Sequence, residues 1–159
     1  MKSMATLIFG GVAVCTAAQV NVIPQPLKVV EKGAQMEVGP QFGAKIAEFS
    51  RDAAIPKEGY RLSIGGGGIR IVSSDAAGAF YAAQTMKQMA TKNAEGKWML
   101  PECEIEDAPR FPWRGLHWDD CRHFMGKEAV LKTLDAMAFH KLNRSEERRV
   151  GKECRSRWS

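Results

Sequence analysis

The stretch from Asp107 to Asn143 constrains most strongly what this chain can fold into. Pro109 and Pro112 mark a junction between two parts of the chain, because proline interrupts both helices and strands. The bulky residues 113–118, WRGLHW, predict a strand. After a short loop, apolar residues recur at helical spacing through residues 127–143. A strand, a loop and an amphipathic helix make one βα unit, the repeating element of parallel sheets and (β/α) barrels.

Residues 19–108, before this junction, predict one small α+β domain. Its clearest signal is a pair of alternating segments, 59–64 and 69–74, which predict a β-hairpin closed by the glycines of 65–68. A glycine run also suggests a phosphate-binding loop. That motif needs a following helix and a Lys-Ser/Thr pair, whereas a strand follows here, so nucleotide binding is not favoured.

The rest of this first domain predicts short elements. Pro24 and Pro26 favour an edge or extended segment at 20–30, and residues 36–40 favour a short strand ended by a Gly-Pro pair. The spacing of apolar residues in 41–53 predicts a short amphipathic helix. A longer helix is predicted after Ser74 and Asp75, either of which can cap it. A turn at 93–97 and extended residues up to 107 complete the domain.

The N-terminus has the pattern of a secretion signal. Lys2 precedes a short apolar stretch, and the small residues before Gln19 resemble a cleavage site, which predicts a signal peptide at 1–18. The stretch is too short to anchor the chain across a bilayer. A lipoprotein signal at Cys15 and a buried first helix are the alternatives. We therefore expect export to the periplasm, to the cell surface or to the medium.

Residues 144–159, RSEERRVGKECRSRWS, show neither helical nor alternating apolar periodicity. They resemble the translation of a sequencing-adapter oligonucleotide, and we expect an artefactual tail, with a natural basic tail as the alternative; Arg144 fits either side of the junction. The tail has a net charge of +3, so the chain's +5 falls to +2 without it. The apparent basicity thus lies mostly in the tail, and nucleic-acid binding is not favoured.

Cysteine and histidine usage gives little sign of metal chemistry. Without the signal and the tail, Cys103 and Cys121 remain, and they can form a disulfide or stay as free thiols. No CxxC motif or Cys/His cluster suggests zinc. His117 and His123 flank the predicted end of a strand, where a metal site is a weak alternative. We expect no metal and no cofactor.

The chain resembles family 20 of the glycoside hydrolases, the β-N-acetylhexosaminidases. The matching residues in the second part are DAPRFPWRGLHWD at 107–119, RHF at 122–124 and LDAMAFHKLN at 134–143. In the first part they are IPQP at 23–26, EGYRLSI at 58–64, the glycine hairpin and AAGAFYAAQTMKQM at 76–89. The resemblance covers residues 20–143. It implies an accessory α+β domain at 19–108 and the first βα unit of a truncated (β/α)8 TIM barrel at 109–143.

Arg122 is the one site residue that the resemblance carries over, as the family arginine that binds the hydroxyls at C3 and C4 of a terminal N-acetylhexosamine. A guanidinium presents a rigid fork of donors that can hold two neighbouring hydroxyls. The alternative is a structural ion pair with Asp119 or Asp120. Asp120 and Cys121 depart from the family pattern, which more often has an apolar and a small residue at these positions.

The resemblance implies exo-acting, retaining hydrolysis in which the substrate's own acetamido oxygen is the nucleophile. The family's catalytic Asp-Glu pair lies further along and matches nothing in these 159 residues. We assign no catalytic residue and expect this chain alone to be inactive; the acidic run of Glu102, Glu104, Glu106 and Asp107 is expected to be solvated. The expected partners are glycans containing N-acetylhexosamine. The alternative is a non-catalytic, carbohydrate-associated scaffold domain. Linkage preference and oligomeric state are not encoded.

Overall fold

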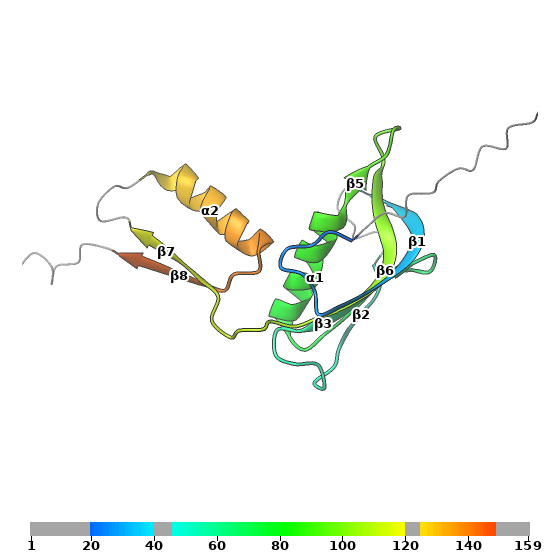
Figure 1. Ribbon diagram of the computed structural model, residues 1–159, viewed down its shortest axis with the longest axis horizontal. Coiled ribbons are helices and arrows are strands. Elements are labelled where there is room, and N and C mark those ends of the chain that lie inside the picture. The colour runs from blue at the N-terminus through cyan, green and yellow to red at the C-terminus, as the bar shows by residue number, and fades with distance from the viewer. Residues whose placement is uncertain (1–19, 40–45, 120–124, 149–159) are drawn as a thin grey trace, which may run out of the picture.

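The computed structural model describes residues 20–39, 46–119 and 125–148. They form a mixed α+β sheet domain followed by a strand–helix–strand unit (Figure 1). The elements in chain order are β1 (Lys28–Val38), β2 (Ile46–Arg51), β3 (Tyr60–Gly65), β4 (Gly68–Ser73), α1 (Ala76–Met89), β5 (Thr91–Lys92), β6 (Trp98–Asp107), β7 (Gly115–Asp119), α2 (Lys127–Phe139) and β8 (Arg144–Arg148).

Six strands make one sheet in the order β1-β6-β3-β4-β2, and the short β5 pairs with β6. The hairpin predicted from the alternating segments is present: β3 and β4 pair antiparallel from Tyr60 opposite Ser73 to Gly65 opposite Gly68. β2 is the one strand of this path that pairs in parallel, with β4. β1 lies at the edge, as the prolines before it suggested, and its register shifts between Glu31 and Gln35. The hairpin therefore forms the centre of the sheet together with β6.

Helix α1 covers one face of this sheet (Figure 1). Asp75, one of the two capping residues that the sequence offered, caps it by accepting a hydrogen bond from the Gly78 amide. Gly78 is required for the approach of the helix to the sheet, because a Cβ there would lie 2.2 Å from the carbonyl oxygen of Gly59. The alternating residues of three strands and one side of α1 form the core. Its largest fully buried side chains are Tyr60, Leu62, Ile64, Ile69, Leu100, Ile105, Thr85, Cys103 and Ser73.

The opposite face of the sheet is charged. Lys32 pairs with Glu104, Arg70 with Glu48, and Arg61 with both Glu106 and Asp52. All of these side chains are more than a third exposed. Exposed pairs of this kind contribute about 0–1 kcal/mol each. The domain is therefore stabilised mainly from the face that α1 covers.

The second part contains the predicted βα unit and a further strand. β7 leads through residues 120–126 to α2, and β8 then pairs in parallel with β7, with Gly115 opposite Arg144. Helix α2 ends at Phe139 rather than at residue 143, because the amides of Lys141 and Leu142 turn back to the carbonyls of Ala138 and Met137. This pattern is a Schellman motif, which stops a helix by a left-handed residue. The chain is thereby turned into β8 within four residues.

The helix predicted at residues 41–53 is wrong for residues 46–51. Residues 46–51 form β2 rather than part of a helix, because the segment pairs along β4 from Ile46 to Arg51. Ile46 and Phe49 suit a helix by spacing, but both are branched or aromatic residues that strands also favour, and both stay partly exposed at this edge. The first residues of the predicted tail, Arg144–Arg148, also form a strand, although they have no apolar pattern. These residues form a strand because they pair with β7, and not because of their own strand propensity.

Candidate functional site

The carboxyl end of β7 is the site that the sequence predicts. β7 ends at Asp119, and residues 120–124, which include Arg122 and His123, lie outside the described residues. His117, on the strand itself, is exposed. Across residues 20–39, 46–119 and 125–148, no group of three His, Cys, Asp or Glu side chains is arranged to hold a metal ion. The role of Arg122 therefore stays a prediction.

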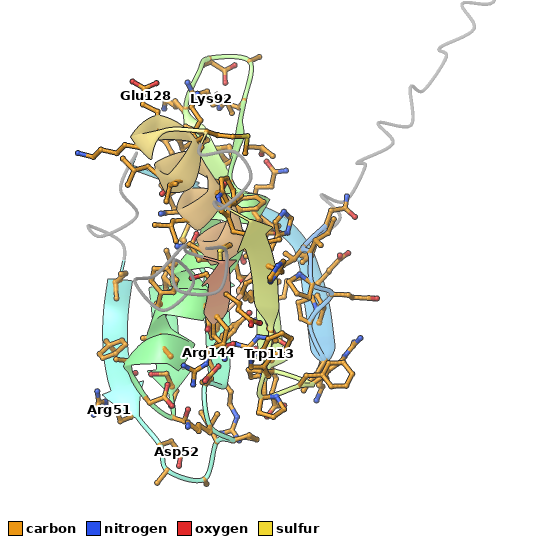
Figure 2. All side chains as sticks on the ribbon, turned by 90° about the vertical axis from the view of Figure 1, so that its left-hand side faces the viewer. Arg51, Asp52, Lys92, Trp113, Glu128 and Arg144 are labelled. Atoms are coloured by element: carbon orange, nitrogen blue, oxygen red, sulfur yellow. The ribbon has the colours of Figure 1, made fainter. Side chains whose placement is uncertain are left out.

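The two parallel strands point the carboxyl end of β7 away from the sheet domain. In Figure 1 both β7 and β8 run outward from the sheet domain. Their amino ends lie against the sheet domain, where Arg114, just before β7, contacts Glu58 and Tyr81. Figure 2 labels Trp113 and Arg144 beside each other at these amino ends. The amino ends of β7 and β8 are thus bound to the sheet domain, and their carboxyl ends point away from it.

Arg114 is the centre of the contacts at the held end. Its guanidinium donates to the Glu58 carboxylate at 2.6 Å and to the Tyr81 hydroxyl at 3.0 Å, both in the sheet domain. It also donates to the carbonyls of Lys141 at 2.9 Å and Phe111 at 2.8 Å. The Arg114 side chain is 12% exposed and that of Glu58 is 18% exposed. This buried, multiply bonded arginine joins the sheet domain to the starts of both β7 and β8.

Lys141 forms a second link, from the end of α2 into the sheet domain. Its ammonium donates to the Asp107 carboxylate at 2.8 Å and to the Tyr60 hydroxyl at 2.9 Å. Tyr60 also donates to Asp107 at 3.1 Å and shares a hydrogen bond of 2.6 Å with Thr85 of α1. The Lys141 side chain is 7% exposed. A lysine 81 residues away in sequence is therefore bound to the tyrosine that begins β3.

We refer to Arg114, Glu58, Lys141, Asp107 and Tyr60 as the interdomain clasp. Burial raises the pKa of Tyr60, and the neighbouring Asp107 carboxylate raises it further. Burial lowers the pKa of Lys141, while the hydrogen bond to Asp107 opposes that decrease. Both acidic members are ion-paired, so they act as acceptors that fix a cation rather than as bases facing a substrate.

Two members of the clasp have backbones that glycine would adopt more readily. Glu58 has φ of 61° and Lys141 has φ of 59°, and these are the positive-φ residues other than glycine in the described part of the chain. A left-handed backbone costs an L-residue roughly 1 kcal/mol relative to glycine. At both positions the side chain makes the contacts that join the two parts. Neither residue is evident from the sequence, because a positive φ at a charged residue has no local signal.

A cavity of about 220 Å³ lies at the clasp. It is lined by Pro24, Gln25, Glu58, Tyr60, Tyr81, Asp107, Ala108, Pro109, Arg110, Phe111, Arg114 and Lys141. Because Arg114 immediately precedes β7, the cavity adjoins the amino end of that strand. Active sites of (β/α) barrels lie at the carboxyl ends of the strands, whereas the amino ends serve stability. The cavity therefore belongs to the junction and not to the predicted substrate site.

The acidic run before the junction behaves only partly as predicted. Glu104 and Glu106 are exposed and paired with Lys32 and Arg61, as expected of a solvated face. Asp107 was predicted to be solvated, and this was wrong, because its side chain is 12% exposed and bound to Lys141. The alternation of β6 explains the difference: Cys103, Ile105 and Asp107 share the inner face, a period-2 signal present in the sequence.

Cys103 is a free thiol in the core of the sheet domain. Burial raises its pKa to about 11. Its predicted alternative partner, Cys121, lies outside the described residues. A thiol that stays protonated and covered is chemically inert, so Cys103 is a packing residue rather than a reactive one.

Comparison with known proteins identifies the family. The description "Glycosyl hydrolase family 20, domain 2" matches residues 43–108, and "Glycosyl hydrolase family 20, catalytic domain" matches residues 111–145. The chain belongs to glycosyl hydrolase family 20. The domain 2 match coincides with β2 through β6, and the catalytic-domain match with β7, α2 and the start of β8. The family resemblance drawn from the sequence is thus confirmed.

Relatives of this family 20 chain are considerably longer. It is 45% identical over 100 residues to the N,N'-diacetylchitobiase of Vibrio harveyi, covering 62% of this chain and 11% of that protein. It is 36% identical over 118 residues to a beta-hexosaminidase of Porphyromonas gingivalis, covering 69% of this chain and 15% of that protein. A solved N-acetyl-beta-hexosaminidase of Streptomyces plicatus superposes with a TM-score of 0.67 at 26% identity, over 79% of this chain and 34% of that one.

Proposed function

We propose that the full-length protein is an exo-acting β-N-acetylhexosaminidase that removes terminal N-acetylglucosamine or N-acetylgalactosamine from glycans. The observation that carries this proposal is the match of two consecutive family 20 domains, in order, to the sheet domain and to β7, α2 and the start of β8. Relatives named as hexosaminidases and chitobiase support the same substrate class. The chain spans 11% and 15% of the first two relatives, so the activity belongs to the complete protein.

The proposed chemistry is retaining, substrate-assisted hydrolysis in a complete (β/α)8 barrel. Arg122 binds two neighbouring hydroxyls of the terminal sugar, which holds the ring where binding energy can assist its distortion. The acetamido oxygen of the substrate attacks the anomeric carbon, and an Asp-Glu pair beyond this chain supplies orientation and the general acid. Since no residue of residues 1–159 matches that pair, this chain alone is inactive under the proposal.

Export is part of the same proposal. The basic residue Lys2, the short apolar stretch and the small residues before Gln19 support a signal peptide at residues 1–18, which lie outside the described residues. Among the helices that the structure describes, none is long and apolar enough to cross a membrane. Glycan polymers are too large to enter a cell unaided, so an exported enzyme would meet its substrate directly.

The test is an assay of the full-length protein with a chromogenic β-N-acetylglucosaminide and the matching β-glucoside. Release from the first substrate alone is the expected result, because the acetamido group is the nucleophile. The Arg122→Ala variant should lose about 10²-fold or more in kcat/KM, as both hydroxyl contacts are removed. An inert full-length protein would favour the non-catalytic scaffold alternative. An active Arg122→Ala variant with unchanged KM and kcat would instead refute the role proposed for Arg122.

A further inference from the structure

We propose that Lys141 and Arg114 are positioning residues of the glycosidase, which set the carboxyl end of β7 by fixing the amino end of this strand against the sheet domain. The inference rests on the proposed function. It assigns to the sheet domain a part in substrate binding that needs no contact with the substrate. Neither residue lies at the end of β7 where the sugar is expected, so both act through the strands.

The first observation is that both strands begin inside the clasp. The Arg114 amide donates to the side chain of Asn143 at 3.1 Å, and the Arg114 carbonyl accepts from the amides of Asn143 and Arg144 at 2.9 and 3.2 Å. The strand pairing continues directly with Gly115 opposite Arg144. Since the Arg114 guanidinium is held by Glu58 and Tyr81, the sheet domain fixes the register and direction of both strands at their origin.

The second observation is the conformation and burial of Lys141. It occupies the left-handed position of a Schellman motif, with φ of 59°, where glycine or asparagine is usual. Its ammonium is nonetheless placed on Asp107 and Tyr60, in a setting that is 7% exposed. The left-handed backbone and the desolvation of the ammonium both cost free energy. The contacts of the Lys141 side chain with Asp107 and Tyr60 offset both costs. Glycine would suit this backbone better than lysine does. The side-chain contacts of Lys141 therefore serve to fix the position of the α2–β8 turn.

The third step is geometric. β7 has five residues, and a strand rises about 3.3 Å per residue, so its two ends are about 13 Å apart. A rotation of about 5° at the amino end moves the carboxyl end by about 1 Å. Displacements of about 1 Å far from the chemistry can lower rates by about 10²-fold. Loss of the clasp contacts would therefore displace the carboxyl end of β7, from which the chain continues to Arg122.

The experiment uses the full-length enzyme with a chromogenic β-N-acetylglucosaminide, well below its melting temperature. Lys141→Met removes the ammonium but keeps the length of the side chain. Asp107→Asn combined with Lys141→Met removes both charges, so that no unpaired buried carboxylate remains. Lys141→Gly suits the left-handed backbone while removing the contacts. Lys32→Met is the matched control, because Lys32 pairs with Glu104 on the exposed face of the same sheet.

We expect all three Lys141 variants to lower kcat/KM at least tenfold, mainly through KM, while Lys32→Met leaves both constants unchanged. The double variant and Lys141→Gly should recover thermal stability relative to Lys141→Met without recovering KM. Lys141→Arg, which keeps a cation, should recover part of KM.

Recovery of KM in step with stability in the double variant would overturn the positioning role, since the clasp would then act on folding alone. Unchanged KM and kcat in folded Lys141→Met would overturn it as well. An inactive wild-type enzyme would refute the proposed function and this inference together, which distinguishes that failure from the other two.

Discussion

The sheet domain and the β7–α2–β8 unit bury their apolar side chains to very different degrees. In the sheet domain, α1 covers the strands, and Leu62, Ile69 and Leu100 have no exposed surface. In α2, Met137 is the buried residue of the described helix, while Leu131 and Leu134 remain 50% and 46% exposed. The sheet domain therefore has a core of its own. The strand–helix–strand unit leaves much of its apolar surface exposed, and the clasp joins it to the sheet domain.

Most of the stability of this family 20 chain lies in the sheet domain. Burial of apolar surface contributes about 25 cal/mol per Å², so a covered face stabilises a domain and a half-exposed one does so only weakly. Polar contacts then decide the position of the second unit, since Arg114 and Lys141 bind it to the sheet domain. Three further measurements test this contrast.

The largest expected effect is at the core of the sheet domain. Leu62→Ala should lower the free energy of unfolding by about 4 kcal/mol, because it removes a fully buried side chain from the centre of the hairpin. Leu134→Ala in α2, where this side chain is 46% exposed, should cost less than about 1 kcal/mol. Urea unfolding followed by circular dichroism measures both. Equal losses in the two variants would break the contrast between a covered and an uncovered face.

A smaller effect is expected from the burial of the Cys103 thiol in that core. The folded-state pKa of Cys103 is raised by burial from 9.0 to about 11, so the folded state holds its proton more tightly than the unfolded state. The resulting stability is present below pH 9 and is lost as pH rises through 11, by about 3 kcal/mol at most. Unfolding in urea at several pH values should show this decline in the wild type and a flatter profile in Cys103→Ala. Identical slopes would mean that water reaches the thiol.

The smallest effect compares the two helix starts. Asp75 caps α1, whereas Gly126 at the start of α2 makes no side-chain cap. Asp75→Ala should cost about 1 kcal/mol at neutral pH, and Asp75→Asn much less, because asparagine also caps helices.

This contribution should depend on pH in the acidic range. The Gly78 amide lowers the folded-state pKa of Asp75 below 3.8, so the stability is present above that value and is lost as pH falls through the folded-state pKa. Melting temperatures of the wild type and Asp75→Ala should therefore converge in acid. A constant difference would show that the cap does not titrate.

The sequence by itself determined the elements whose signals are local. The glycine-closed hairpin, helix α1 with its Asp75 cap, and the βα unit of β7 and α2 follow from alternation, capping and helical spacing. The family resemblance rested on the same segments. These features depend on neighbours within a few residues, which is the range over which a sequence pattern acts.

Strands β2 and β8 and the contacts of Lys141 depend instead on tertiary contacts. β2 is a strand because β4 pairs with it, and β8 is a strand because β7 does, although neither segment has a strand pattern of its own. The contact of Lys141 with Tyr60 and Asp107 joins residues 81 and 34 positions apart, and it turns a carboxylate predicted to be solvated into a buried partner. Strand pairing and the desolvation of a charged side chain depend on contacts between segments that are distant in sequence. A local pattern of residues does not specify these contacts.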